Sequence, residues 1–183
     1  MATYISMLRG INVGGHNKID MKGLKALYED LGFRGVSTYI QSGNIIFRSD
    51  QKTSDQILAG NIEKSILKKY RLEVPVIIRT LEEINSSIQV NPFLKRTSIL
   101  IEKLHITFLS EEPLKSDWDI IKGLDRSPDE FTRIGKDIYL YCPEGYGITK
   151  LSNSFFENKL KVKATTRNWN TVNKLQELAK GIT

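Results

Sequence analysis

The stretch that decides the fold of this chain is VSTYIQSGNIIFR, which covers Val36–Arg48. Two runs rich in β-branched and aromatic residues flank the triplet Ser42-Gly43-Asn44, whose members are typical turn formers. This pattern is typical of a β-hairpin with strands over 36–41 and 45–48. The hairpin predicts an antiparallel sheet, and the segments around it show which elements join that sheet.

The segment before the hairpin predicts one strand and one helix. Residues 3–9 are rich in strand formers, and apolar residues of 21–31 recur at helical spacing. Asp20 is a good N-cap for this helix, and Gly32 is a typical residue just beyond a helix end. A strand, a loop and a helix therefore precede the hairpin.

The segment after the hairpin predicts a second helix and a closing strand. Thr53 and Gln56 have the spacing of a capping box at a helix start, and a strand over 74–79 follows. Thr80 and Glu83 repeat the capping-box spacing and predict a linking helix. The resulting order is βαββαβ, which is the split βαβ or ferredoxin-like arrangement.

The same order of elements recurs in the rest of the chain, without a repeat at the level of residues. We expect a strand over 104–109, a helix over 116–124, a hairpin of 131–134 and 138–141, a helix over 152–160, a short strand over 161–164 and a final helix over 170–180.

The predicted fold class is therefore α+β, with two consecutive βαββαβ (ferredoxin-like) halves plus a C-terminal helix. We expect the halves to cover residues 1–90, including the linking helix, and residues 91–183. The strands at 45–47 and 74–78 carry apolar residues on both faces, whereas half-exposed antiparallel strands alternate apolar with polar residues. We therefore expect the two halves to pack into one body.

Composition narrows the class of protein. Of the 183 residues, 40% are hydrophobic and 26% charged, as in ordinary globular chains, and no apolar run approaches the ~20 residues of a membrane span. The start of the chain lacks the basic region of a secretory signal, and the lone Cys142 permits no intrachain disulfide. These features predict a cytoplasmic protein without membrane contact. The net charge of +6 favours anionic partners, and residues 145–183 hold seven basic and two acidic side chains.

Three stretches of the chain carry a resemblance to a known family. They are LRGINVGG at Leu8–Gly15 with NKI at Asn17–Ile19, TYIQSGNIIF at Thr38–Phe47, and TRNWNTV at Thr166–Val172. Together they resemble an uncharacterised, mainly bacterial family catalogued as domain of unknown function 1697. The resemblance implies a duplicated βαββαβ arrangement and supplies no activity.

The loop after the first strand is the leading candidate for a ligand site. Gly10, Gly14 and Gly15 precede a helix start, where free N–H groups and the helix dipole attract anions. The loop also carries the cations Arg9 and Lys18 and the amides of Asn12 and Asn17. Its spacing matches neither a dinucleotide fingerprint nor a P-loop, and the glycines are equally explained by a tight turn.

Two further segments supply candidate binding residues. Ser42 and Asn44 form a hairpin turn by their residue types, and they could hydrogen-bond a ligand held by the first loop. Arg167 could clamp an anion, with Trp169 as a stacking surface. The alternative for this second segment is structural: Asn168 or Asn170 caps the last helix and Trp169 packs on the core.

Metal and nucleophile chemistry find little support in the sequence. The two histidines, His16 and His105, are not accompanied by a zinc motif, so we expect no metal and no cofactor. His105 lies in a predicted strand, and Cys142 at a strand end is expected to be a small buried or edge residue without a neighbouring base. No reaction type is selected by these patterns.

Three functions remain open. The first is binding of a small anionic or phosphorylated ligand, with or without turnover, at the glycine-rich loop. The second is nucleic-acid binding through the basic C-terminal segment, although the aromatic pattern of RNA-binding sheets is missing. The third is a protein-interaction or structural domain that needs no polar site.

Overall fold

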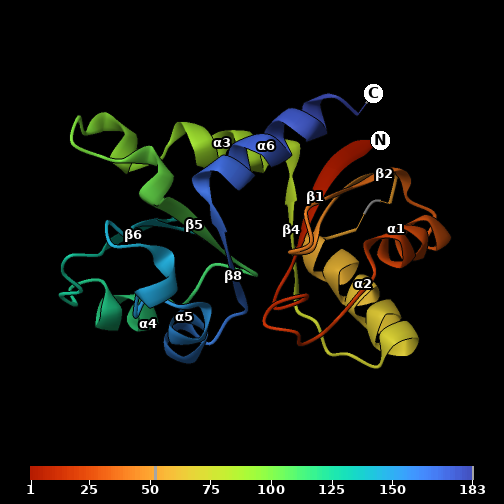
Figure 1. Cartoon of the computed structure of the whole chain (residues 1–183), viewed down its shortest axis with the longest axis horizontal. Coiled ribbons are helices and arrows are strands. Elements are labelled where there is room, and N and C mark those ends of the chain that lie inside the picture. Colours follow the sequence, from red (N-terminus) through yellow and green to blue (C-terminus); the bar gives the residue numbers. More distant parts are fainter. Residues whose placement is uncertain (52, 183) are drawn as a thin grey trace. The chain divides into compact units, whose positions relative to one another are not determined.

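The structure, a computed structural model, describes residues 1–51 and 53–182. The chain forms two compact units, of which the first comprises residues 1–85 and 174–183 and the second residues 86–173. Each unit contains one four-stranded antiparallel sheet, and the described residues form six α-helices (Figure 1). The fold is therefore α+β, as the sequence predicts. No helix within the described residues has the length and apolar character that crossing a membrane requires.

The sheet of the first unit has the strand order β2-β3-β1-β4. Every neighbouring pair is antiparallel. The elements are β1 (Ala2–Leu8), α1 (Met21–Asp30), β2 (Arg34–Tyr39), β3 (Asn44–Ser49), α2 (Asp55–Tyr70) and β4 (Val76–Thr80). The central hairpin and the βαββαβ order of this unit thus agree with the sequence prediction.

The sheet of the second unit has the corresponding order β6-β7-β5-β8. Its elements are β5 (Leu104–Leu109), α4 (Lys115–Ile121), β6 (Glu130–Ile134), β7 (Asp137–Tyr141), α5 (Asn153–Leu160) and β8 (Ala164–Asn168). The chain also contains α3 (Leu81–Gln89), α6 (Trp169–Lys180) and three short 3₁₀-helices at Pro92–Lys95, Ile101–Lys103 and Tyr146–Ile148. The order βαββαβα therefore occurs twice.

Helix starts follow local capping signals, with one correction. The Asp20 carboxylate accepts a hydrogen bond from the backbone N–H of Gly23 at 2.8 Å and caps α1. Thr80 and Glu83 form the predicted capping box, because each side chain accepts from the backbone N–H of the other. The prediction of Thr53 as the cap of α2 is wrong: Ser54 takes this position.

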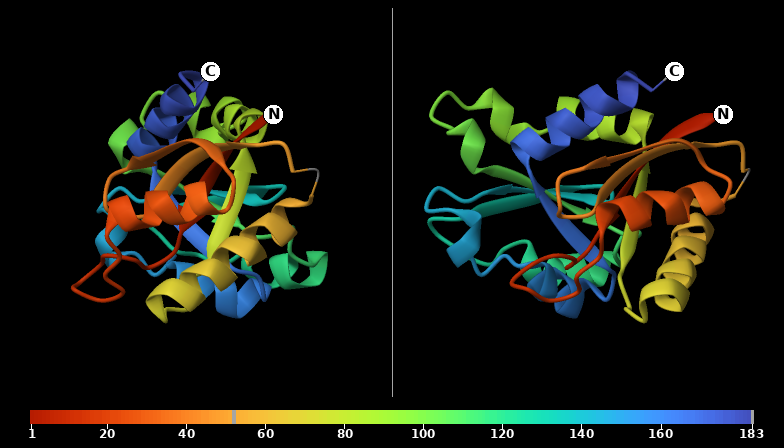
Figure 2. Two further views of the ribbon diagram at one scale, coloured as in Figure 1. Left: turned by 90° about the vertical axis from the view of Figure 1, so that its right-hand side faces the viewer. Right: turned by 45° about the vertical axis from the view of Figure 1, so that its right-hand side comes forward.

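Helices α1 and α2 cover one face of the first sheet (Figure 2). Aromatic rings dominate the core beneath them: Phe47 of β3 lies 5.5 Å from Tyr4 and 4.4 Å from Phe33, measured between ring centroids. Ile5, which points to the opposite face of the sheet, is also fully buried. The strand β1, which carries Tyr4 on one face and Ile5 on the other, is therefore buried on both faces. The sequence predicts the same for the strands at 45–47 and 74–78.

The last strand lies three residues later than predicted. Lys161, expected to open a strand, is the left-handed residue that ends α5, at φ 59°. The strand β8 instead runs over Ala164–Asn168 and pairs with β5 through residues such as Ile106 and Arg167. Its threonines favour extended backbone, but the pairing joins residues about sixty positions apart, which no local pattern reveals.

Candidate functional site

The loop after β1 and the turn before β3 lie side by side at one end of the first unit. We call residues 9–19 and 40–44 together the two-loop end. The side-chain amide of Asn12 donates to the carbonyl of Gln41 at 3.0 Å, and the N–H of Leu8 donates to the carbonyl of Gly43 at 2.8 Å. A Cβ at Gly43 would lie 2.8 Å from the Cβ of Leu8, so only glycine permits this approach.

The glycine pair of the first loop forms the tip of a miniature hairpin. The N–H of His16 donates to the carbonyl of Val13 at 3.0 Å, and Gly14 and Gly15 have φ angles of 57° and 81°. These values are those of a type I′ turn, which requires a positive φ at both central residues. The glycines therefore form an exposed turn that precedes the start of α1.

Asn12 holds this loop together. Its amide nitrogen donates to the carbonyl of Ile19 at 3.0 Å as well as to Gln41, and its oxygen accepts from the N–H of Ile19 at 2.9 Å. Asn17 adds a second internal bond from its amide to the carbonyl of Gly10. Both asparagine side chains are thus engaged within the two-loop end and position its backbone.

The start of α1 already carries a negative charge. Asp20 caps the helix, and its carboxylate occupies the N–H of Gly23. A carboxylate in this position satisfies part of the helix-terminal donors and complements the helix dipole. An anionic ligand at this end would therefore be held by the loops, from which Arg9 (half-buried) and Lys18 (exposed) contribute cations.

The turn residues Ser42 and Asn44 have a clear role in the fold. Asn44 is fully buried, and its amide donates to the carbonyl of Tyr39 at 3.2 Å and to the hydroxyl of Ser42 at 3.0 Å. These bonds close the turn between β2 and β3. Next to it, Ile40 is half exposed and has a left-handed backbone with φ 52°, which is unusual for a β-branched residue.

Arg167 and Trp169 belong to the second unit. Arg167 lies in β8, is 8% exposed, and donates to the hydroxyl of Thr165 and the carbonyl of Thr166 at 2.8 and 2.9 Å. Burial lowers the pKa of its guanidinium to about 10. Trp169 is the buried first residue of α6, and the side chain of Asn168 caps this helix. Of the two caps that the sequence suggests for α6, Asn168 and Asn170, the structure shows Asn168.

A polar cluster that the sequence did not reveal lies on the helix-covered face of the second sheet. The hydroxyl of Thr166 meets the hydroxyls of Thr107 at 2.7 Å and Tyr146 at 3.0 Å, and it donates to Asn153 at 2.7 Å. The ring of His105 stacks on Tyr146 at 4.8 Å, and burial lowers the pKa of this histidine. The cluster joins β5, β8 and the start of α5, a combination that only the pairing of β5 with β8 creates.

Cys142 and the histidines lack the surroundings of a reactive centre. Cys142 is buried, and burial together with the charge of Asp129 raises the pKa of its thiol to about 11. A thiol in this state is a weak nucleophile at neutral pH. Among the described residues, no group of three or more potential metal ligands occurs.

Comparison with known proteins gives a family and a structural relative. A family model described as "Protein of unknown function (DUF1697)" matches residues 1–139. The chain is similar to a solved structure of the conserved bacterial protein SP0830 from Streptococcus pneumoniae, with a TM-score of 0.75 and 26% sequence identity over 97% of this chain and 98% of that chain. No curated protein matches the chain significantly.

Proposed function

The chain belongs to the DUF1697 family, and we propose that it binds a small anionic or phosphorylated ligand at the two-loop end of its first unit. The residues of this end include the cations Arg9 and Lys18 and no carboxylate. Exposed N–H groups of a glycine turn suit the oxygens of such a ligand, because a backbone without side chains can approach it closely.

The observation that carries the proposal is the concentration of left-handed backbone in two adjoining loops. The residues with positive φ there are Gly10, Asn12, Gly14, Gly15, Asn17, Ile40 and Gly43. Such conformations cost on the order of 1–3 kcal/mol each outside glycine and gather at binding and catalytic sites. A loop pair held in this way is ordered before a ligand arrives, which reduces the entropy lost on binding.

The residues of the two-loop end have different roles in this proposal. Arg9 and Lys18 attract the anion, and Gly14 and Gly15 present backbone donors to it. Asn12, Ser42 and Asn44 hold the loops in place. Arg167 and Trp169, which the sequence also suggested, stabilise β8 and the start of α6 rather than contact the ligand.

The test uses inorganic phosphate, pyrophosphate and a nucleoside diphosphate as probes. Lys18→Gln and Arg9→Gln are compared with Lys68→Gln, an equal loss of charge on α2, which lies outside the two loops. A ligand at 100 times its Kd raises the free energy of unfolding by ~2.7 kcal/mol, so thermal unfolding detects binding.

We expect at least one probe to stabilise the wild type and the control variant, and to stabilise the two loop variants much less. Equal stabilisation of all four proteins would place the anion elsewhere. No stabilisation by any probe would reject binding of anions of this size.

We also propose that the halves 1–90 and 91–183 are copies of one ferredoxin-like unit. The strand orders β2-β3-β1-β4 and β6-β7-β5-β8 correspond position by position, and each is the order of that arrangement. Nucleic-acid binding has less support than anion binding. Ferredoxin-like sheets stack bases on exposed aromatics, whereas Tyr4 and Phe47 of the central strands lie in the core under α1 and α2.

A further inference from the structure

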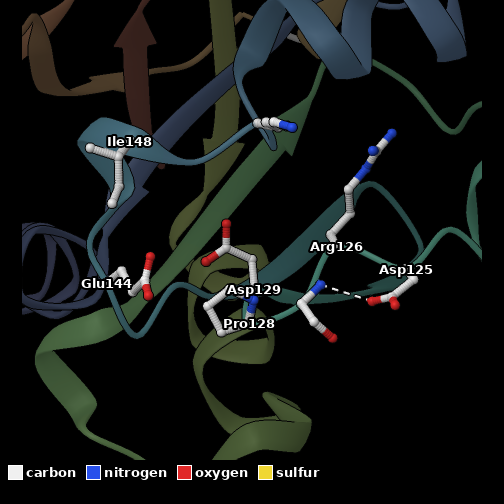
Figure 3. Close-up of a pocket in the computed structure, with 8 residues that line it drawn as sticks. Asp125, Arg126, Pro128, Asp129, Glu144 and Ile148 are labelled. Carbon is white, nitrogen blue, oxygen red and sulfur yellow. Dashed lines mark hydrogen bonds between the residues drawn. The ribbon is translucent and has the colours of Figure 1, made fainter.

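The second unit contains a pocket lined by charged residues of both signs. Its volume is about 230 Å³, and two segments line it: residues 125–129 before β6, and residues 144–150 after β7. In the view of Figure 3, Asp129 lies between Glu144 and Arg126, and Pro128 and Ile148 add apolar surface. The pocket is smaller than the ~300–1,000 Å³ typical of drug-sized ligands, so its ligand would be small.

The acidic side of the pocket is positioned by hydrogen bonds. One oxygen of Asp129 accepts from the hydroxyl of Thr149 at 2.5 Å, and that hydroxyl accepts from the N–H of Leu151 at 3.1 Å. Glu144, whose carboxylate lies on the same side of Asp129 as Ile148 in Figure 3, makes no hydrogen bond or ion pair with the described residues. Asp125 is the third carboxylate of the lining and accepts a hydrogen bond from the backbone N–H of Ser127 at 2.8 Å. Three carboxylates therefore border the pocket, and none of them makes an ion pair with the described residues.

The basic side of the pocket contains an unsatisfied donor. The Nε of Arg126 is buried and has no hydrogen-bond acceptor among the described residues. Its guanidinium lies over the ring of Phe155, with 5.0 Å from Cζ to the ring centroid, and this stacking restrains its plane. Lys150 is exposed and, like Glu144, has no partner within the described part of the chain. A buried donor without an acceptor is rare and indicates an acceptor supplied by water or by a ligand.

We propose that this pocket binds a small zwitterion of the amino-acid type. Arg126 and Lys150 receive its carboxylate, and Asp129 and Glu144 receive its ammonium group. The cations and the carboxylates of this pocket form no ion pairs with each other. A ligand that carries a positive and a negative charge would complement both groups. A simple anion would meet the three carboxylates of the lining, and a simple amine would meet Arg126 and Lys150.

The test begins with the twenty common amino acids, each titrated against the full chain by saturation-transfer NMR. The best binder is then compared with its N-acetyl derivative, which lacks the ammonium group, and its amide, which lacks the carboxylate. Hydrogen bonds to charged groups contribute about 1.5–3 kcal/mol, so each blocked form should raise Kd roughly 10- to 100-fold.

Matched variants locate the binding. Glu144→Gln and Lys150→Gln remove one pocket charge each, and Glu111→Gln and Lys159→Gln remove the same charges from exposed positions of the second unit outside the pocket. We expect the two pocket variants to weaken binding about tenfold or more and the two controls to leave it unchanged, with equal thermal stability for all four.

Three results would overturn the proposal. They are the absence of binding by any of the twenty amino acids at 10 mM (roughly the weakest useful affinity), undiminished binding of the N-acetyl or amide form, and equal weakening by the pocket and control variants.

Discussion

Ile40 has a strained backbone conformation in the turn before β3. A β-branched side chain is poorly tolerated at φ 52°, and its half-exposed position provides little burial in return. The neighbouring Gln41 receives the hydrogen bond of Asn12, so the strained turn is held by the adjacent loop. The strain is therefore maintained by a contact within the two-loop end.

Ile40→Gly should stabilise the protein. Relief of the left-handed conformation contributes about 1–2 kcal/mol, and the greater entropy of glycine in the unfolded chain offsets about 0.5–1 kcal/mol of it. A net gain of about 1 kcal/mol raises Tm by roughly 2–4 °C in a chain of this length. Ile148→Gly, at an exposed residue without positive φ, serves as the control and should lower Tm. A fall in Tm for both variants would show that Ile40 is not strained.

The sequence indicates the backbone conformation of this protein's turns better than the roles of its polar side chains. Positive φ at Gly14, Gly15 and Gly43 follows from their turn context. The burial of Asn44 and Arg167 does not, because both are polar and only the sheet around them removes them from water. The side chains of Asn44 and Arg167, both candidate ligand contacts, thus make hydrogen bonds within the protein.

At the scale of elements, helix starts are predictable to within a residue. The residue type of Asp20 and the spacing of the Thr80–Glu83 pair predict these caps, because a cap acts on N–H groups only two or three residues away. The capping-box spacing of Thr53 with Gln56 predicts Thr53 as the cap of α2, but Ser54 holds this position. The backbone N–H of Ile57 instead donates to the hydroxyl of Ser54 at 3.3 Å.

Ser54→Ala should destabilise α2 and with it the first unit. Loss of an N-cap hydroxyl costs typically ~1 kcal/mol, whereas Thr53→Ala removes no cap and should cost less than about half of that. Urea denaturation followed by circular dichroism measures both changes. A larger loss of stability for Thr53→Ala than for Ser54→Ala would show that Thr53 caps α2.

At the scale of the whole molecule, Cys142 reports whether the second unit is folded. Its thiol is fully buried in the core beneath α4 and α5. With a pKa of about 11, only about one thiol in a thousand is ionised at pH 8, and the thiolate is the reactive form. Reaction with a thiol reagent therefore requires an opening of this unit.

Labelling of Cys142 with a disulfide reagent at pH 8 should be at least ~100-fold slower in native protein than in urea-unfolded protein. The control is Lys159→Cys in a Cys142→Ala background, because residue 159 is exposed on α5 of the same unit. This control should react rapidly without urea. Equal rates for the native Cys142 and the control would mean that the core of the second unit is open in solution.

The helices, the turns and the βαββαβ order are largely predictable from the sequence, because caps, glycines and apolar periodicity act over a few neighbouring residues. The charge of the loops around Arg9 and Lys18 is also evident from the sequence. The position of β8, the burial of Arg167 and the pocket around Asp129 emerge in the folded chain. Each of these depends on pairing or approach between segments distant in sequence, such as Ile106 with Arg167, and such contacts have no local signature.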